Sequence, residues 1–346
     1  MEPTPFDLDK LDLTRHSDDL FIFACGFEDR AQIIPEHVLN GRFPRTVVAI
    51  TYENTGNANL KGSALLKRFK QVCCVQEIKF SPRSAERFIS DCANVFDVRS
   101  LALAKSFQID ISAMSQFLVM LLLRFLRGEF FNREFHLFYV AAKAYYPPTT
   151  KIKLLLAKHE RAELRMSEIL SMDEPAADVM FENMLAGSFH RIDKSCLMIF
   201  CGYELNRSLA AYNSINPTRV VFIHSVGTVK DAEFRAKYSK MIHEFVGGGV
   251  SKATETVCTM NIGEQISLLR EYYHYLGGDH DMVLAPVHSK MEAIAALLFV
   301  EEFPDVQVVF PVPVSYSLSK AAKGVGEVYS IKLPPIPGLR LAREGN

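Results

Sequence analysis

Short, continuous apolar runs along this chain alternate with longer segments whose apolar residues recur at helical spacing. Runs such as 20–25 and 197–201 are typical of strands that are buried on both faces of a parallel sheet. The order strand, helix, strand, helix, strand, helix, strand occurs twice. Since crossovers between parallel strands are right-handed, this order predicts a doubly wound parallel sheet with helices on both faces.

The two copies of this pattern also match in residue type, which indicates an internal duplication. The matched segments are LFIFACGFEDRA (20–31) with LMIFCGYELNRS (197–208), FPRTVVAI (43–50) with NPTRVVFI (216–223), and DISAMSQFLVMLLLRFL (110–126) with VHSKMEAIAALLFVEEF (287–303). Distant segments keep nearly the same register, so we expect two tandem, diverged Rossmann-like units. The alternative is that similar patterning arose twice in one α/β sheet without duplication.

Each copy ends in a stretch of alternating apolar and polar residues, at 162–169 and at 327–333. Period-two alternation predicts a half-exposed strand, here an antiparallel strand at the edge of each sheet. Turn signals and a short amphipathic centre between the copies predict an inter-domain linker that contains a helix. The sequence therefore predicts an α/β fold with a first unit at 1–172, a linker at 173–195 and a second unit at 196–346.

The composition of the 346-residue chain is that of a folded protein with neither a strongly basic character nor a membrane span. Hydrophobic residues make up 49% and charged residues 23%, enough for a substantial core. The formal net charge of −1 excludes a global nucleic-acid footprint and leaves room for a local basic groove. The N-terminus lacks an apolar signal core, and the apolar run 117–123 is too short to cross a bilayer. We therefore expect a cytoplasmic protein.

The seven cysteines include no CxxC pair and no Cys/His cluster at zinc spacing. Cys25 and Cys201 end apolar runs, which is typical of buried, reduced thiols in a cytosolic protein. The turns after the first strands lack the GxGxxG fingerprint, and the glycines at 247–249 lack a P-loop ending. The sequence thus predicts no metal site and no nicotinamide or flavin cofactor.

The strongest candidate site is the turn after the first strand of each copy, because ligands of open parallel sheets bind at the carboxyl ends of strands. The residues concerned are Gly26, Glu28 and Arg30 in the first copy and Gly202, Glu204 and Arg207 in the second. The glycine would let a ligand approach backbone amides at a helix start, and the arginine suits a phosphate. The glutamate could hold a ribose hydroxyl or orient the arginine. The structural alternative is a tight turn in which each glutamate pairs with its own arginine.

Further candidates follow the later strands of each copy. They are Asp110, Ser112, Tyr145, His224, His288, Ser289, Lys290 and Tyr316. The two serines precede apolar helices and are predicted to be helix N-caps that also contact ligand. Lys290 could pair with a phosphate, Asp110 could accept from a hydroxyl, and the tyrosines could stack on a base. Ordinary caps, turns and rim aromatics would explain the same residues without a ligand.

At these turns the chain resembles the CARF and SAVED group, Rossmann-like sensors of cyclic or linear oligonucleotide signals in prokaryotic antiviral defence. SAVED domains look like two fused CARF units, which fits the duplication. By position, 26–30 and 202–207 correspond to the family's turn after the first strand, and 110–112 and 288–290 to its polar turn after the fourth. The chain departs from the family pattern because the double glycine is absent and the lysine occurs only in the second copy.

These features support a nucleotide- or oligonucleotide-binding sensor, acting as a regulator or as a component of a defence system with a partner protein or as a homo-oligomer. The ligand would lie between the two halves, with Arg30, Arg207 and Lys290 on phosphate. The rival is a nucleotide-processing enzyme, a hydrolase or N-glycosidase, with one active and one degenerate half. His224 and His288, which occur only in the second copy, favour that rival. A third hypothesis is a scaffold whose sites are vestigial.

Overall fold

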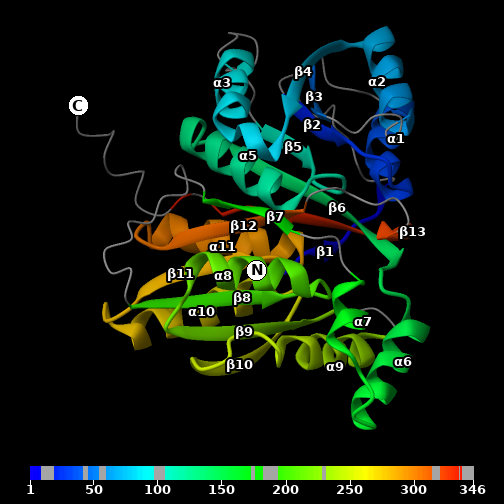
Figure 1. Ribbon diagram of the computed structural model, residues 1–346. Coiled ribbons are helices and arrows are strands. Elements are labelled where there is room, and N and C mark those ends of the chain that lie inside the picture. Colours follow the sequence, from blue (N-terminus) through cyan, green and yellow to red (C-terminus); the bar gives the residue numbers. More distant parts are fainter. Residues whose placement is uncertain are drawn as a thin grey trace. The chain divides into compact units, whose positions relative to one another are not determined.

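The computed structural model describes residues 1–8, 19–41, 46–53, 60–96, 106–172, 176–181, 194–227, 231–313, 320–334 and 336. The chain divides into two compact units, each built around one sheet (Figure 1). The first unit comprises residues 3–144 and 322–346, and the second comprises residues 1–2 and 145–321. Within the described ranges, no helix has the length and apolar character needed to cross a membrane.

The first unit alternates strands and helices as the apolar runs predict. Its elements are β1 (Thr4–Pro5), β2 (Asp19–Cys25), η2 (Asp29–Gln32), α1 (Ile33–Asn40), β3 (Thr46–Tyr52), α2 (Leu60–Val72), β4 (Cys74–Phe80), η4 (Pro82–Ser84), α3 (Ala85–Phe96), β5 (Ser106–Asp110), α5 (Gln116–Glu129), β6 (Glu134–Ala144) and β13 (Lys323–Lys332). The strand order is β1-β13-β6-β5-β2-β3-β4, in which β2 to β6 are parallel and β13 pairs antiparallel with β6.

The second unit repeats the same alternation. Its elements are α6 (Thr149–Glu160), α7 (Met166–Leu170), β7 (Ala176–Phe181), β8 (Ser195–Cys201), α8 (Leu205–Ile215), β9 (Arg219–Val226), α9 (Ala232–His243), β10 (Ser251–Cys258), α10 (Ile262–Leu276), β11 (Asp281–Pro286), α11 (Lys290–Glu302) and β12 (Gln307–Pro313). The strand order is β10-β9-β8-β11-β12-β7, with β8 to β12 parallel and β7 antiparallel at the edge.

The parallel strands have one common order in the two sheets. Numbered along the chain within each unit, that order is 3-2-1-4-5, so β2 corresponds to β8 and β5 to β11. The order reverses between the first and fourth strands, which in doubly wound sheets is the point where ligands bind. The predicted fold class, α/β with an antiparallel strand at the edge of each parallel sheet, is confirmed. Descent of both units from one duplicated unit stays a prediction.

The antiparallel strands are exchanged between the two units. Strand β7 follows the first unit's parallel strands in the chain but pairs with β12 of the second, and β13 follows β12 but pairs with β6 of the first. Figure 1 shows the red strand β13 beside the blue-green β6, and the green β7 beside the orange β12. Because of this exchange, β7 belongs to the second unit and β13 to the first, and the predicted boundaries at 172 and 196 stay a prediction.

The predicted edge strand at 162–169 is wrong. Residue Ala162 has a positive φ of 56°, and the Glu168 side chain accepts from the backbone N–H of Arg165 at the start of the short helix α7. The other alternating stretch, 327–333, does contain an antiparallel strand, β13, although it lies in the first unit's sheet. Within the predicted linker, 176–181 is strand β7, and the helix expected there falls in part on 173–175 and 182–193, outside the described residues.

Helices cover the two faces of each sheet in the same way. In the first unit, α1 and α2 share an apolar cluster with Phe21, Phe23 and Cys25, and in the second unit α8 and α9 share one with Ile199 and Cys201. The predicted apolar helices are buried on all sides rather than on one face: every residue of 117–123 in α5 and 291–300 in α11 is buried. The burial predicted for Phe117, Leu118, Leu121, Leu122, Ala293, Ala296 and Leu297 is confirmed.

Candidate functional site

The glycine turns lie at the reversal point of each sheet, directly after β2 and β8. A side chain built on Gly26 would place its Cβ 2.6 Å from the Cβ of Ala113, and one on Gly202 would lie 3.1 Å from Nδ1 of His288. Both neighbours belong to the turn after the fourth parallel strand. The glycines therefore allow two turns of the protein to pack against each other, and this close packing explains them without a ligand.

The first unit's arginine is bound within its own turn. The Nε of Arg30 donates to Glu28 at 2.6 Å, and Nη1 donates to the carbonyl of Val140 and to the hydroxyl of Tyr139. The other carboxylate oxygen of Glu28 accepts from the backbone of Ala322. Arg30 is only 7% exposed. These bonds match the structural alternative, and phosphate binding by Arg30 stays a prediction.

A second hydrogen-bond network follows β5. The carboxylate of Asp110 accepts from the backbone N–H of Ser112 at 2.9 Å and from its hydroxyl at 2.5 Å, and that hydroxyl accepts from the backbone N–H of Val140. The predicted N-cap role of Ser112 is wrong, because Ser115 caps α5 by accepting from the backbone N–H of Leu118. The loop after β5 is longer than its counterpart after β11, and this shifts the cap.

The second unit keeps the matching ion pair but in a more open form. Arg207, in the first turn of α8, donates through Nη1 to Glu204 at 3.2 Å, and the Glu204 side chain is 54% exposed. The Nε of Arg207 is buried and has no hydrogen-bond partner among the described residues. Unlike Arg30, this arginine therefore has a donor that is shielded from water without an acceptor in the described part of the chain.

A second arginine, Arg235, lies in the first turn of α9 and is 4% exposed. Its Nη2 donates to the carbonyls of Tyr145 and Pro147, and its Cζ lies 5.1 Å from the ring centroid of Tyr203. Its Nη1 is buried and, within the described ranges, also has no hydrogen-bond partner. Two helices that follow neighbouring strands thus each bring one incompletely bonded guanidinium to the same edge of the sheet.

His288 lies near both arginines, since the charges of Arg207 and Arg235 both act on its ring. Its ring contacts that of Tyr203 edge-on at 4.9 Å. The pKa of His288 is lowered to about 4, mainly by burial and in part by the nearby charges of Arg207 and Arg235. Burial also raises the pKa of Tyr203 to about 12. We call Tyr145, Tyr203, Arg207, Arg235 and His288 the arginine cluster; it is cationic, because it holds two guanidinium groups and its imidazole is neutral near pH 7.

Next to this cluster is a buried acid. Glu292 accepts from the hydroxyl of Ser225 at 2.5 Å and from the backbone N–H of Ser289, while Ser289 caps α11 as predicted. Burial raises the pKa of Glu292 to about 7, although these hydrogen bonds oppose the shift. Lys290 begins α11 and is half-buried. The carboxyl group of Glu292, which is hydrogen-bonded to Ser225, can therefore exchange a proton near neutral pH.

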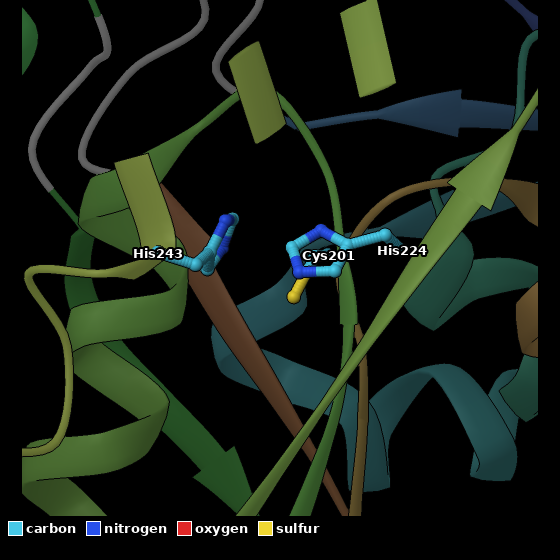
Figure 2. Close-up of side chains that lie close together, drawn as sticks. All are labelled: Cys201, His224 and His243. Carbon is cyan, nitrogen blue, oxygen red and sulfur yellow. The ribbon is translucent and has the colours of Figure 1, made fainter. Parts of the chain in front are cut away.

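His224 belongs to a different group of side chains. It lies at the end of β9 opposite Cys201 of β8, and one ring nitrogen of His224, one of His243 in α9 and the Cys201 sulfur all lie within 4.8 Å of one another (Figure 2). All three residues are buried. Burial lowers the pKa of His224 to about 3 and of His243 to about 4, and raises that of Cys201. These are donors of the type that bind zinc-class metals.

The structure brings only some of the predicted site residues together. Tyr145, Gly202, Arg207 and His288 meet at one edge of the second sheet, whereas Asp110 and Ser112 close a separate network in the first unit. Tyr316 lies outside the described residues. A ligand shared by Arg30 and Arg207 stays a prediction.

Sequence reasoning missed Tyr203, Arg235, Cys201 and His243 as site residues. Tyr203 is the aromatic residue of the repeated Cys-Gly-aromatic-Glu turn, so a signal was present. Arg235 lies in the first turn of α9, beyond the strand end at which the candidates stopped. His243 lies far from Cys201 in sequence, and no spacing motif connects them.

Comparisons with known proteins show a likeness of structure only. No protein-family model matches the chain, and no curated protein matches it. Among solved structures, the chain is similar to a Type III CRISPR defence DNA nuclease activated by cyclic oligoadenylate, with a TM-score of 0.47 and 10% identity over 82% of this chain and 63% of that one. A ketoreductase domain from the bacillaene assembly line has a TM-score of 0.20 and 12% identity over 88% of this chain and 69% of that one. The N-terminal domain of Candida albicans trehalose-6-phosphate phosphatase has a TM-score of 0.22 and 10% identity over 88% and 92%.

Proposed function

We propose that this chain is a nucleotide- or oligonucleotide-binding sensor whose anionic ligand binds at the arginine cluster of the second unit. The ligand phosphate would accept from Arg207 and Arg235, and the half-buried ring of Tyr145 would contact a base. The resemblance to CARF and SAVED sensors would place such a protein in antiviral defence. Within this proposal the first unit contributes the scaffold, because its corresponding polar groups bond to one another.

The observation that carries the proposal is the pair of buried guanidinium donors, Nε of Arg207 and Nη1 of Arg235, which have no hydrogen-bond acceptor among the described residues. A buried donor without an acceptor costs about 1–3 kcal/mol, and more when it is charged. An anion at this edge would remove that cost. Phosphate suits two converging guanidinium groups because each can make charge-assisted hydrogen bonds to its oxygens.

Isothermal titration calorimetry of the full chain with a panel of nucleotides tests this proposal. The panel includes mononucleotides, linear oligoadenylates and cyclic oligoadenylates, with inorganic phosphate as the minimal probe. Arg207→Ala and Arg235→Ala should each weaken binding by about 10- to 100-fold, the loss expected for a hydrogen bond to a charged group. The proposal fails if no member of the panel binds, or if both variants bind as the unmodified protein does.

Arg219→Ala is the matched control. Arg219 lies at the start of β9, at the opposite edge of the same sheet, and contacts the ring of Tyr275. Removing it lowers the net charge by the same amount as either test variant, so a general electrostatic effect would weaken binding equally in all three. Melting temperatures of the free proteins separate loss of binding from loss of folding.

The rival enzyme is supported by the Ser225–Glu292 pair, because a carboxyl whose pKa is about 7 suits general acid–base catalysis. The predicted acids Glu28 and Asp110 do not join this pair, since both have partners within the first unit. Chromatography of the same nucleotide panel after incubation would detect turnover. A product that forms with the unmodified protein and not with Glu292→Gln would favour the enzyme hypothesis over the sensor hypothesis.

A further inference from the structure

Three elements of the second unit bring soft metal donors into one buried place. Cys201 ends β8, His224 lies beside it on β9, and His243 ends α9. The sulfur and one nitrogen of each ring lie within 4.8 Å of one another, and Figure 2 shows the three side chains close together. Zinc with ligands at about 2.0–2.3 Å holds such donors roughly 3–4 Å apart, so small side-chain movements would complete the geometry.

One residue orients both imidazoles. The hydroxyl of Ser239 lies 2.9 Å from Nδ1 of His224, and the carbonyl of the same residue lies 2.7 Å from Nδ1 of His243. The carbonyl can only accept, so His243 carries its proton on Nδ1 and has its lone pair on Nε2. That Nε2 accepts from the Ser208 hydroxyl, which can rotate away. A hydrogen bond from Nδ1 to a protein oxygen is the usual support of a histidine that binds metal through Nε2.

A cavity gives the cluster access and a further coordination position. It has a volume of about 310 Å³ and is lined by both histidines together with Phe222, Lys240, Glu244, Lys252 and Thr254. Three protein ligands beside such a space are typical of a zinc site with an open position for water or substrate. The two lysines favour an anionic fourth ligand.

Among its described residues, the first unit lacks this arrangement at the corresponding place. Cys25 ends β2 as Cys201 ends β8, but its neighbour in the parallel register is Thr51, where Cys201 has His224. A buried cysteine at this position therefore fits either unit, whereas the histidines are specific to the second. Since the first unit has the same strand order without these histidines, the fold itself does not require the Cys201, His224 and His243 cluster.

We propose that Cys201, His224 and His243 bind a divalent metal of the zinc class, with a fourth ligand supplied from the cavity. Two neutral imidazoles and one thiol form a donor set that prefers zinc over magnesium or calcium. Binding would release the thiol proton to solvent, leaving a thiolate on the metal. Glu292, which lies close enough to Cys201 to affect its thiol, and Glu244 of the cavity would offset the remaining positive charge. This inference does not depend on nucleotide binding.

Metal titration of the full chain tests the site directly. After treatment with chelator, the protein should bind one equivalent of Zn²⁺ in competition with a chromophoric chelator, and should not bind Mg²⁺ or Ca²⁺ there. Co²⁺ should produce thiolate-to-metal charge-transfer absorption and the intense visible bands of a tetrahedral complex. Cobalt absorption without a thiolate band would overturn the proposal, and so would failure to compete for zinc.

Variants assign the ligands. Cys201→Ser and His243→Gln should each abolish the cobalt thiolate spectrum or shift it. Ser239→Ala removes only a hydrogen bond to His224 and should weaken zinc binding by about 10- to 100-fold. Each ligand variant should weaken zinc binding by more than this. Cys196→Ser is the matched control, since Cys196 is an equally buried thiol on the same strand. Equal loss in Cys196→Ser and Cys201→Ser would overturn the assignment. If Cys201→Ser does not fold, the cobalt spectrum of the unmodified protein still decides.

Discussion

The carboxyl edges of the two sheets show how one strand order can support different chemistry. In the first unit Ala113 fills the reversal point beside Gly26, Arg30 is bonded on several sides, and Asp110 and Ser112 bond each other. In the second unit the same positions hold a histidine beside Gly202 and an arginine whose buried Nε has no hydrogen-bond partner in the described part of the chain. The polar groups at the first edge form hydrogen bonds with one another, whereas the second edge has guanidinium donors that an external ligand could use.

This contrast gives a criterion for finding a ligand site in a protein with two similar halves. Residue type alone treats Arg30 and Arg207 as equivalent, because each follows a glycine turn and faces a glutamate. Their hydrogen bonds distinguish them, since only one guanidinium has all the acceptors its burial requires. We therefore expect mutations at the first edge to change stability, and mutations at the second to change binding.

The largest effect should come from Ser112→Ala at the first edge. The change removes a hydrogen bond to the Asp110 carboxylate and leaves the buried N–H of Val140 without its acceptor. The two losses together should cost about 3 kcal/mol of unfolding free energy. Ser289→Ala at the second edge removes a helix cap and should cost about 1 kcal/mol. Urea unfolding of both variants measures the two losses of unfolding free energy. Equal losses would contradict the contrast between the two edges.

The second edge should make stability depend on pH through Glu292, whose pKa burial raises from 4.5 to about 7. Between these values the folded protein holds a proton that the unfolded chain has released, so this contribution to stability falls as pH rises. It is fully present below pH 4.5 and lost above pH 7, a difference of about 3 kcal/mol at 1.36 kcal/mol per pKa unit.

The measurement is urea unfolding of the unmodified protein and of Glu292→Gln across this pH range. His224, whose pKa is lowered to about 3, contributes with the opposite sign in both proteins, so the difference between their slopes isolates Glu292. Parallel curves would show that the carboxyl titrates normally.

Arg30→Ala should destabilise the protein by about 2 kcal/mol, because it removes the arginine's hydrogen bonds to one oxygen of the Glu28 carboxylate and to the Val140 carbonyl. Nucleotide affinity should not change, in contrast to Arg207→Ala. Thermal melting and calorimetry on the two variants provide the comparison. A loss of nucleotide affinity in Arg30→Ala with an unchanged melting temperature would support the hypothesis that both halves bind one ligand.

The smallest effect concerns the two glycines. Gly26→Ala should cost about 1–2 kcal/mol, because the new Cβ would meet the short, rigid Ala113 side chain at 2.6 Å. Gly202→Ala should cost less, since its Cβ would meet the His288 ring at 3.1 Å and that ring can tilt. Tilting would disturb the arginine cluster, so calorimetry should detect weaker binding where melting detects little. The reverse order of stabilities would contradict the closed state of the first edge.

Much of the fold was predictable because the apolar runs of β2 and β8 are continuous and the helices α5 and α11 are strongly apolar. The antiparallel strands were harder. Alternation at 162–169 imitates a strand locally, but the hydrogen bond from the Arg165 backbone to the Glu168 side chain favours a helix there. The actual edge strand, β7, is defined by pairing with β12, more than a hundred residues away, and no local pattern reports such pairing.

The site was predictable as an edge of the sheet and less so as a set of residues. Gly202, Arg207 and His288 follow strands in the sequence, so the rule that ligands bind at strand ends finds them. Ser112 was misassigned because the loop after β5 holds a second serine, Ser115, nearer the helix. Whether a polar group is already bonded, as in Arg30, depends on contacts such as Val140 that only the folded chain brings close.

The exchange of β7 and β13 has a consequence for how the chain matures. During synthesis, the first unit's parallel strands emerge early, but the strand that pairs with β6 is made only near residue 332. Until then the outer hydrogen-bonding groups of β6 have no partner, and exposed sheet edges of this kind promote association between chains. One cleavage between 144 and 195 cannot release the first unit with its complete sheet, since β13 stays on the other fragment. The first sheet should therefore be completed only after β13 has been made, later than every strand of the second sheet.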